Sequence, residues 1–174
     1  MEKSVKGLLL FSHILVTLAF VMAWKQSYFA SLVGLESGFQ LHLWMGLTAL
    51  FLSLFANLCI IFYFVGSGVW IKERSKEVYR KQAERGKKIW SIYESANRLK
   101  GKGFPFASMC LVLGLFTFIL GGARQVNAVP NWIHPTLAAL WLLLSWGGIR
   151  PTFKAIDANL LYLDEVSDLV ESSA

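Results

Sequence analysis

Apolar and polar positions divide this chain into long uncharged runs separated by shorter polar segments. The longest run, residues 40–66, contains no Lys, Arg, Asp or Glu. About 20 apolar residues at a rise of about 1.5 Å each cross a hydrocarbon core of about 30 Å, so this run predicts a membrane-spanning helix. Three shorter uncharged runs predict three further spans. The four predicted spans are residues 7–24, 40–66, 104–123 and 131–149.

Glycine and proline mark the expected ends of these spans. Glycine weakens a helix interior, and proline fits the first helical turn, where its missing N–H is not needed. The second span is therefore expected to end or bend near Gly66-Ser67-Gly68, and the third to start near Pro105 and to end at Gly121-Gly122. Pro151 is expected to separate the fourth span from the segment that follows it.

Positive charge is concentrated between the second and third spans. Residues 69–103 carry eleven basic and four acidic residues, a net charge of +7 against +6 for the whole chain. A short basic segment stays on the cytoplasmic side of a membrane, so both termini are also predicted to be cytoplasmic. The first span ends without a small-residue cleavage pattern and is expected to be retained. The short outer connections, residues 25–39 and 124–130, carry little charge.

The C-terminal segment, residues 151–174, differs from the spans. Ile156, Leu160, Leu163 and Val170 fall roughly on one helical face and acidic residues elsewhere, which predicts an amphipathic acidic helix that can dock on the basic segment. We therefore predict an all-α integral membrane protein with four transmembrane helices. Residues 1–150 form its transmembrane domain and residues 151–174 a cytoplasmic helix. The expected location is a bacterial inner (plasma) membrane.

Composition agrees with this class and excludes several functions. The 174 residues are 55% hydrophobic, and the mean hydropathy is +0.51. Cys59 and Cys110 lie inside apolar runs and are expected to be buried thiols. No phosphate loop, HExxH, GxSxG or intramembrane carboxylate pair occurs, so the chain suits an electron-transfer or non-catalytic subunit better than a stand-alone enzyme. The basic segment suits anionic lipid headgroups, and no nucleic-acid-reading module accompanies it.

The histidines carry the functional hypothesis, because ionisable side chains are rare in spans and mark functional sites. His42 opens the second span and His134 the fourth, and both spans start from the outer face. Two imidazoles at one depth predict the axial ligands of one b-type haem between helices. Arg124 and Gln125 are expected to meet its propionates, with Phe39, Trp44 and Trp132 beside the porphyrin. The arrangement resembles, in architecture only, the small haem-carrying membrane anchors of respiratory enzymes. The shared depth of the two histidines predicts an electron-transfer subunit that exchanges electrons with quinone or a partner.

Two other interpretations of the same residues stay open. His42 and Met45 share a helix face, and Met22 and His134 also approach the outer leaflet. Imidazole and thioether ligands therefore predict a site for copper or another small ion as one alternative. The other is a structural or assembly subunit of a larger membrane complex, in which the histidines bond only water, lipid or backbone. His13 belongs to the inner half, where no second histidine pairs with it.

Overall fold

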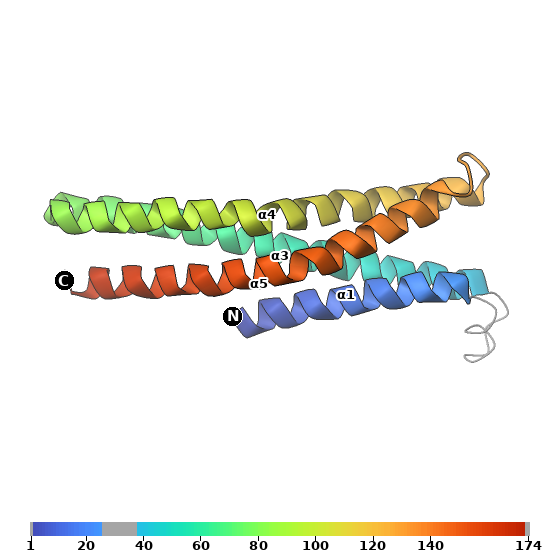
Figure 1. The fold of residues 1–174 in the computed structure, drawn as a ribbon, viewed down its shortest axis with the longest axis horizontal. Coiled ribbons are helices and arrows are strands. Elements are labelled where there is room, and N and C mark those ends of the chain that lie inside the picture. The colour runs from blue at the N-terminus through green and yellow to red at the C-terminus, as the bar shows by residue number, and fades with distance from the viewer. Residues whose placement is uncertain (1, 26–37, 173–174) are drawn as a thin grey trace.

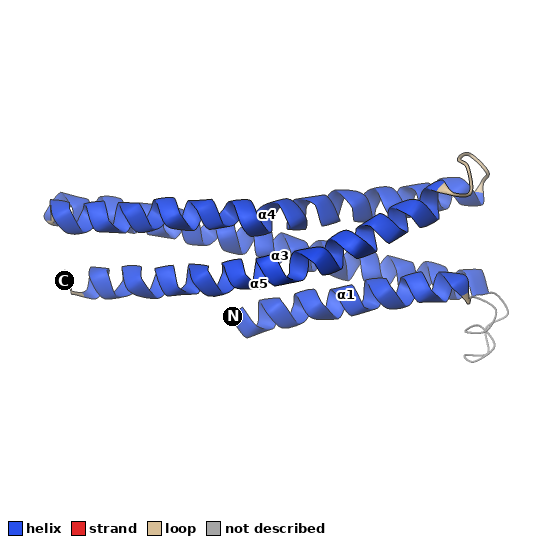
Figure 2. Ribbon diagram, viewed as in Figure 1, coloured by secondary structure: helices blue, strands red, loops and turns tan. Residues whose placement is uncertain are grey.

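The fold is all-α. The computed structural model describes residues 2–25 and 38–172. These residues form four helices, α1 (Glu2–Trp24), α3 (Gly38–Lys81), α4 (Ala83–Gln125) and α5 (Ile133–Glu171). At a rise of about 1.5 Å per residue, α3 is about 66 Å long. Figures 1 and 2 show an elongated bundle whose helices run along its long axis. Residues 26–37, most of the predicted connection between the first two spans, lie outside the described residues.

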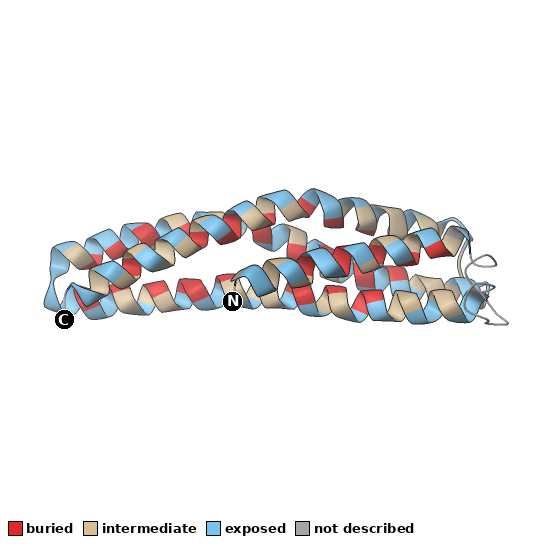
Figure 3. Ribbon diagram, turned by 90° about the horizontal axis from the view of Figure 1, so that it is seen from below, coloured by how far each residue is buried: buried red, intermediate tan, exposed pale blue. Residues whose placement is uncertain are grey.

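The bundle has four helices at one end and three at the other. α3 and α4 form an antiparallel hairpin that turns at Gln82, and α5 packs against α4 along its length (Figure 1). α1 joins only the end where α3 starts. Buried residues recur along each helix (Figure 3) and form three clusters. Two of them include α1 and centre on Trp141 and Phe64, and the third joins α3, α4 and α5 around Ile89.

The four-helix end presents an apolar exterior. Three helices are long and apolar enough to cross a membrane, over Lys3–Ala23, Phe39–Lys81 and Ala83–Gln125. Large side chains such as Phe51, Phe62 and Ile119 are 60–68% exposed on these helices. Such a surface is unfavourable in water and expected in lipid, which indicates an integral membrane protein. The fourth predicted span forms the first half of α5, which is not among these three helices within the described residues.

Several expected helix ends are wrong. α3 continues through Gly66–Gly68 to Lys81, so residues 69–103 form the tip of the α3–α4 hairpin as two helices that continue the predicted spans. Pro105 lies inside α4, and Gly121-Gly122 lies before its end at Gln125. A glycine costs an exposed helix only about 1 kcal/mol, and packing along a long hairpin offsets that amount.

Pro151 does not end the fourth span either. It lies inside α5, near the middle of that 39-residue helix. Proline removes one helical hydrogen bond and its ring displaces the preceding turn, which bends a helix without necessarily breaking it. Figure 1 shows α5 changing direction about midway along its length. The expected acidic helix over residues 151–174 is therefore the second half of α5, where Val166 packs into the cluster around Ile89.

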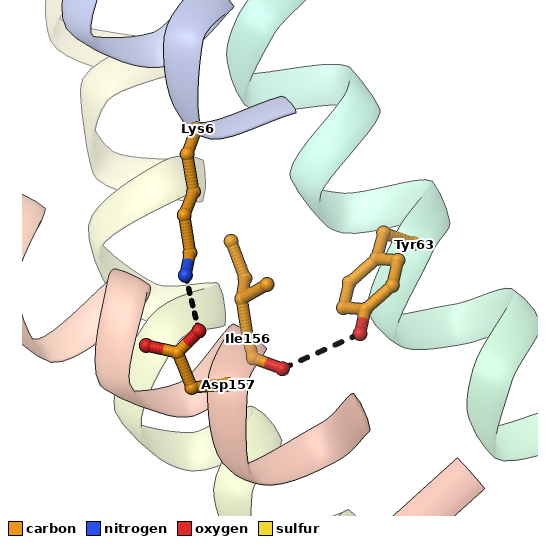
Figure 4. A network of polar contacts seen from close by, with 4 residues as sticks. All are labelled: Lys6, Tyr63, Ile156 and Asp157. Carbon is orange, nitrogen blue, oxygen red and sulfur yellow. Dashed lines mark hydrogen bonds and ion pairs between the residues drawn. The ribbon is translucent and has the colours of Figure 1, made fainter. Parts of the chain in front are cut away.

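A polar network fastens the start of α1 to α5 (Figure 4). Lys6 forms an ion pair with Asp157, and its ammonium nitrogen lies 5.6 Å from the centroid of the Phe153 ring. On the neighbouring α3, the Tyr63 hydroxyl donates to the Ile156 carbonyl at 3.4 Å. These contacts lie where the apolar exterior gives way to the charged three-helix end, and they tie three helices together there.

Candidate functional site

A cavity of about 680 Å³ lies at the four-helix end, among residues of α1, α3, α4, α5 and the α4–α5 connection. Its volume falls within the range of about 300–1,000 Å³ that is usual for small-molecule and cofactor sites. Its walls include His42 and His134, with Arg124 and Gln125 near the connection and Trp141 further along α5. The fold thus gathers the four residues predicted to hold a cofactor at one cavity.

The two histidines face one another across helices α3 and α5. Their ring centroids are 6.3 Å apart and their planes are inclined by 77°. The Nδ1 atom of His134 lies 3.0 Å from the Thr117 carbonyl oxygen on α4. Because a carbonyl can only accept, Nδ1 carries the proton and Nε2 keeps its lone pair. A backbone carbonyl that orients a histidine in this way is the usual support of a metal-binding imidazole.

The separation of the rings can be tested against metal ligation. A ligating imidazole nitrogen lies about 2.0–2.1 Å from its metal, and ring bonds of about 1.35 Å place each nitrogen about 1.15 Å from its centroid. Two imidazoles that held one metal ion from opposite sides would therefore have centroids about 6.4 Å apart, and the two rings lie 6.3 Å apart. An edge-to-face contact of two neutral rings also allows this distance. The surroundings of the rings must therefore distinguish a ligand site from simple packing.

Unpartnered polar atoms favour a ligand or water in the cavity over simple packing. Within the described residues, four buried side-chain nitrogen or oxygen atoms have no hydrogen-bond partner, and three of them belong to residues that line this cavity. Each such atom costs about 1–3 kcal/mol unless a ligand or water satisfies it. The three are Nδ1 of His42, Oγ1 of Thr117 and Nε1 of Trp141. Sequence reasoning missed Thr117 and Trp141, since neither residue is unusual in an apolar span.

The α4–α5 connection shapes the polar side of the cavity. The Ala128 amide donates to the Ala123 carbonyl at 2.9 Å and the Asn127 amide to the Arg124 carbonyl at 3.0 Å, which is the pattern of a Schellman motif. Asn127 adopts φ 56°, a left-handed conformation that asparagine tolerates. Nε of Arg124 lies 3.4 Å from the side-chain oxygen of Asn131. This turn holds a cation and several amides at the cavity.

Two glycines of α4 make room for rings of α5. A Cβ atom on Gly121 would lie 2.9 Å from Cε1 of His134, and one on Gly114 would lie 3.0 Å from Cζ2 of Trp141. Both distances are shorter than normal carbon contacts of about 3.5–4.0 Å. The absence of side chains at these positions therefore allows both rings to pack against the backbone of α4.

Of the other residues predicted near the cofactor, one lines the cavity and the rest do not. Phe39 lines the cavity, but Trp44 and Trp132 do not, and they are 65% and 66% exposed. Met22 and Met45 do not line it either, and Met45 packs beside the cluster around Trp141. Within the described residues, no group of three or more His, Cys, Asp or Glu side chains is arranged to hold a metal ion.

His13 is separate from this cavity. It is 2% exposed, its Nδ1 atom lies 3.2 Å from the Ser12 hydroxyl, and its ring meets Trp146 edge to face with centroids 6.2 Å apart. The third histidine is thus a partnered residue of the bundle interior.

Fold and site together define a class: an all-α integral membrane protein with a bis-histidine cavity among its helix ends. Comparison with protein families, with curated proteins and with solved structures found no match to the chain.

Proposed function

We propose that this protein is a small membrane subunit for electron transfer that holds one b-type haem between His42 and His134. The observation that supports it most is the pair of facing imidazoles on one cavity, with ring centroids 6.3 Å apart. His42 has an unpartnered Nδ1, and the Thr117 carbonyl that holds Nδ1 of His134 leaves Nε2 of that ring free, so both side chains could hold the haem iron. When bound, the haem supplies one-electron chemistry, and the quinone pool or a partner subunit exchanges electrons with it.

The residues around the histidines would position the haem and exclude water. Arg124 and Gln125 can meet its propionates by charge-assisted and neutral hydrogen bonds. The apolar walls formed by side chains such as Leu50 and Phe118 suit the porphyrin faces. Gly121 leaves the space in which the His134 ring sits.

We also propose a topology for this function. Four spans, including the first half of α5, would place both termini and the basic tip of the hairpin in the cytoplasm of a bacterial inner membrane. The site would then lie near the outer face. α5 packs against α4 (Figure 1), which supports a fourth crossing. The mean hydropathy of α5 is lowered by its tryptophans, His134 and two prolines.

Absorption spectroscopy tests the haem. Protein purified after haem-replete expression should show a Soret band, and His42→Ala or His134→Ala should abolish it. His13→Gln is the control, because His13 is a span histidine that is buried more deeply than His42 or His134 but does not line the cavity, and it should keep the band. A wild-type sample that remains colourless after haem reconstitution would refute the proposal.

Metal analysis separates this function from the copper alternative, since iron and copper per chain are measured on one sample. A copper site that uses thioethers should also weaken in Met45→Leu and Met22→Leu, whereas haem binding should not change. The structural-subunit alternative predicts neither metal and co-purification with partner subunits in mild detergent.

A further inference from the structure

The basic tip of the α3–α4 hairpin is not used by the proposed haem site. The tip packs with the second half of α5 to form a three-helix arm that extends from the apolar end. The arm consists of α3 from residue 69, α4 up to residue 103 and the second half of α5. Its core around Ile89 is apolar, and ion pairs join Arg74 to Glu77 at 2.7 Å and Lys88 to Glu165 at 3.2 Å. The arm is therefore a folded, charged element with a surface of its own.

A groove of about 470 Å³ runs between α3 and α4 near the turn of the hairpin. Tyr79, Arg80 and Trp90 line it, and no residue of α5 does. Tyr79 is 53% and Trp90 41% exposed, although the surface around them is mostly charged. Tryptophan, tyrosine and arginine are the residues most enriched at the energetic centres of protein interfaces.

The charges around the groove favour an acidic partner. Residues 69–90 carry eight basic and three acidic side chains, a net charge of +5. Lys76 and Lys87 pair with Glu73 at 2.8 Å and Glu84 at 2.7 Å. The hydrogen bond to Glu84 raises the pKa of the Lys87 ammonium. Arg80 forms no ion pair within the part of the chain that the structure describes.

The groove lies too far along α3 from the apolar surface for the surrounding membrane to be its binding partner. Val69, the last large apolar residue exposed on the apolar part of α3, precedes Arg80 by eleven residues, or about 16 Å of helix. Charges of lipid headgroups are largely screened beyond about 8 Å at physiological ionic strength. An acidic protein segment can reach the groove directly.

We propose that the groove formed by Tyr79, Arg80 and Trp90 docks an acidic, amphipathic helical segment of a partner protein. Its apolar side chains would pack on the two aromatic rings, and its carboxylates would pair with Arg80 and the neighbouring Lys81. This contact would recruit a cytoplasmic partner whether or not the protein carries haem.

Fluorescence anisotropy tests this surface with the full chain in nanodiscs of zwitterionic phosphatidylcholine. The probe is a labelled 16-residue helical peptide of glutamate and leucine. Wild-type protein should bind it saturably, and Arg80→Glu or Trp90→Ala should weaken binding by about 5- to 30-fold. Arg98→Glu is the matched control: it makes the same change of net charge on the arm, away from the groove, and should weaken binding less than about twofold.

Three outcomes would overturn the proposal. Equal losses in Arg80→Glu and Arg98→Glu would show diffuse attraction instead of a groove. No saturable binding by wild-type protein, with an unchanged helical circular dichroism spectrum, would remove the site. Binding to phosphatidylglycerol vesicles that requires Arg80, without binding to the peptide, would assign the groove to a second membrane.

Discussion

Gly121→Ala is the sharpest test of the bis-histidine cavity, because it leaves every proposed ligand in place. The new Cβ atom would lie 2.9 Å from Cε1 and 3.0 Å from Nδ1 of His134. A normal carbon contact of about 3.5–4.0 Å requires the ring to retreat by about 0.6 Å or more. Ligand groups must usually be held within about 0.5 Å of their productive positions. The substitution should therefore disturb His134 more than the site tolerates.

The expected magnitude follows from the same contact. A retreat of about 0.6 Å would stretch the 3.0 Å bond from His134 to the Thr117 carbonyl to about 3.6 Å, which is no longer a hydrogen bond. Loss of such an orienting bond typically weakens metal binding about 10- to 100-fold, or about 1.4–2.7 kcal/mol. We expect a loss of that size in the affinity for haem.

The neighbouring glycine provides the control. A Cβ atom on Gly122 would meet nothing within 4 Å, so Gly122→Ala should leave haem affinity unchanged. The assay is titration of haem into the detergent-solubilised apoprotein, followed at the Soret band. Equal affinities of the two variants, or a larger loss in Gly122→Ala, would contradict the position assigned to the His134 ring.

Two further predictions concern the turns of the fold. Gly86→Ala places a Cβ atom 2.5 Å from Cα of Tyr79, a backbone atom that cannot move aside, so it should lower the free energy of unfolding by about 3 kcal/mol. Gly101→Ala, which meets nothing within 4 Å, should be neutral or raise that free energy by up to about 1 kcal/mol. Asn127→Val should lower it by about 1–2 kcal/mol, because a β-branched residue resists φ 56°, whereas Asn127→Gly should keep it within about 0.5 kcal/mol. Thermal unfolding in detergent, followed by circular dichroism, measures the stability of all four variants. Equal stabilities of Gly86→Ala and Gly101→Ala would refute the first prediction, and equal stabilities of Asn127→Val and Asn127→Gly the second.

The sequence alone determined the class of the protein. Uncharged runs of membrane-crossing length predict apolar helices wherever they occur, because backbone groups in lipid must be bonded within the helix. It also drew attention to His42 and His134, since ionisable residues are rare in such runs. Helix ends were harder to predict. Gly66–Gly68 and Pro151 are local signals for an end, and packing along α3 and α5 overrides both.

Tertiary structure decided what the histidines meet. The packing of α5 against α4 sets the His134 ring against Gly121 and its Nδ1 atom against the Thr117 carbonyl. The same packing leaves the Trp141 and Thr117 side chains beside the cavity without partners. Which residues of two helices come into contact depends on how the helices are rotated and shifted along their axes relative to one another. Those two quantities depend on contacts summed over a whole interface, so no single run of residues encodes them.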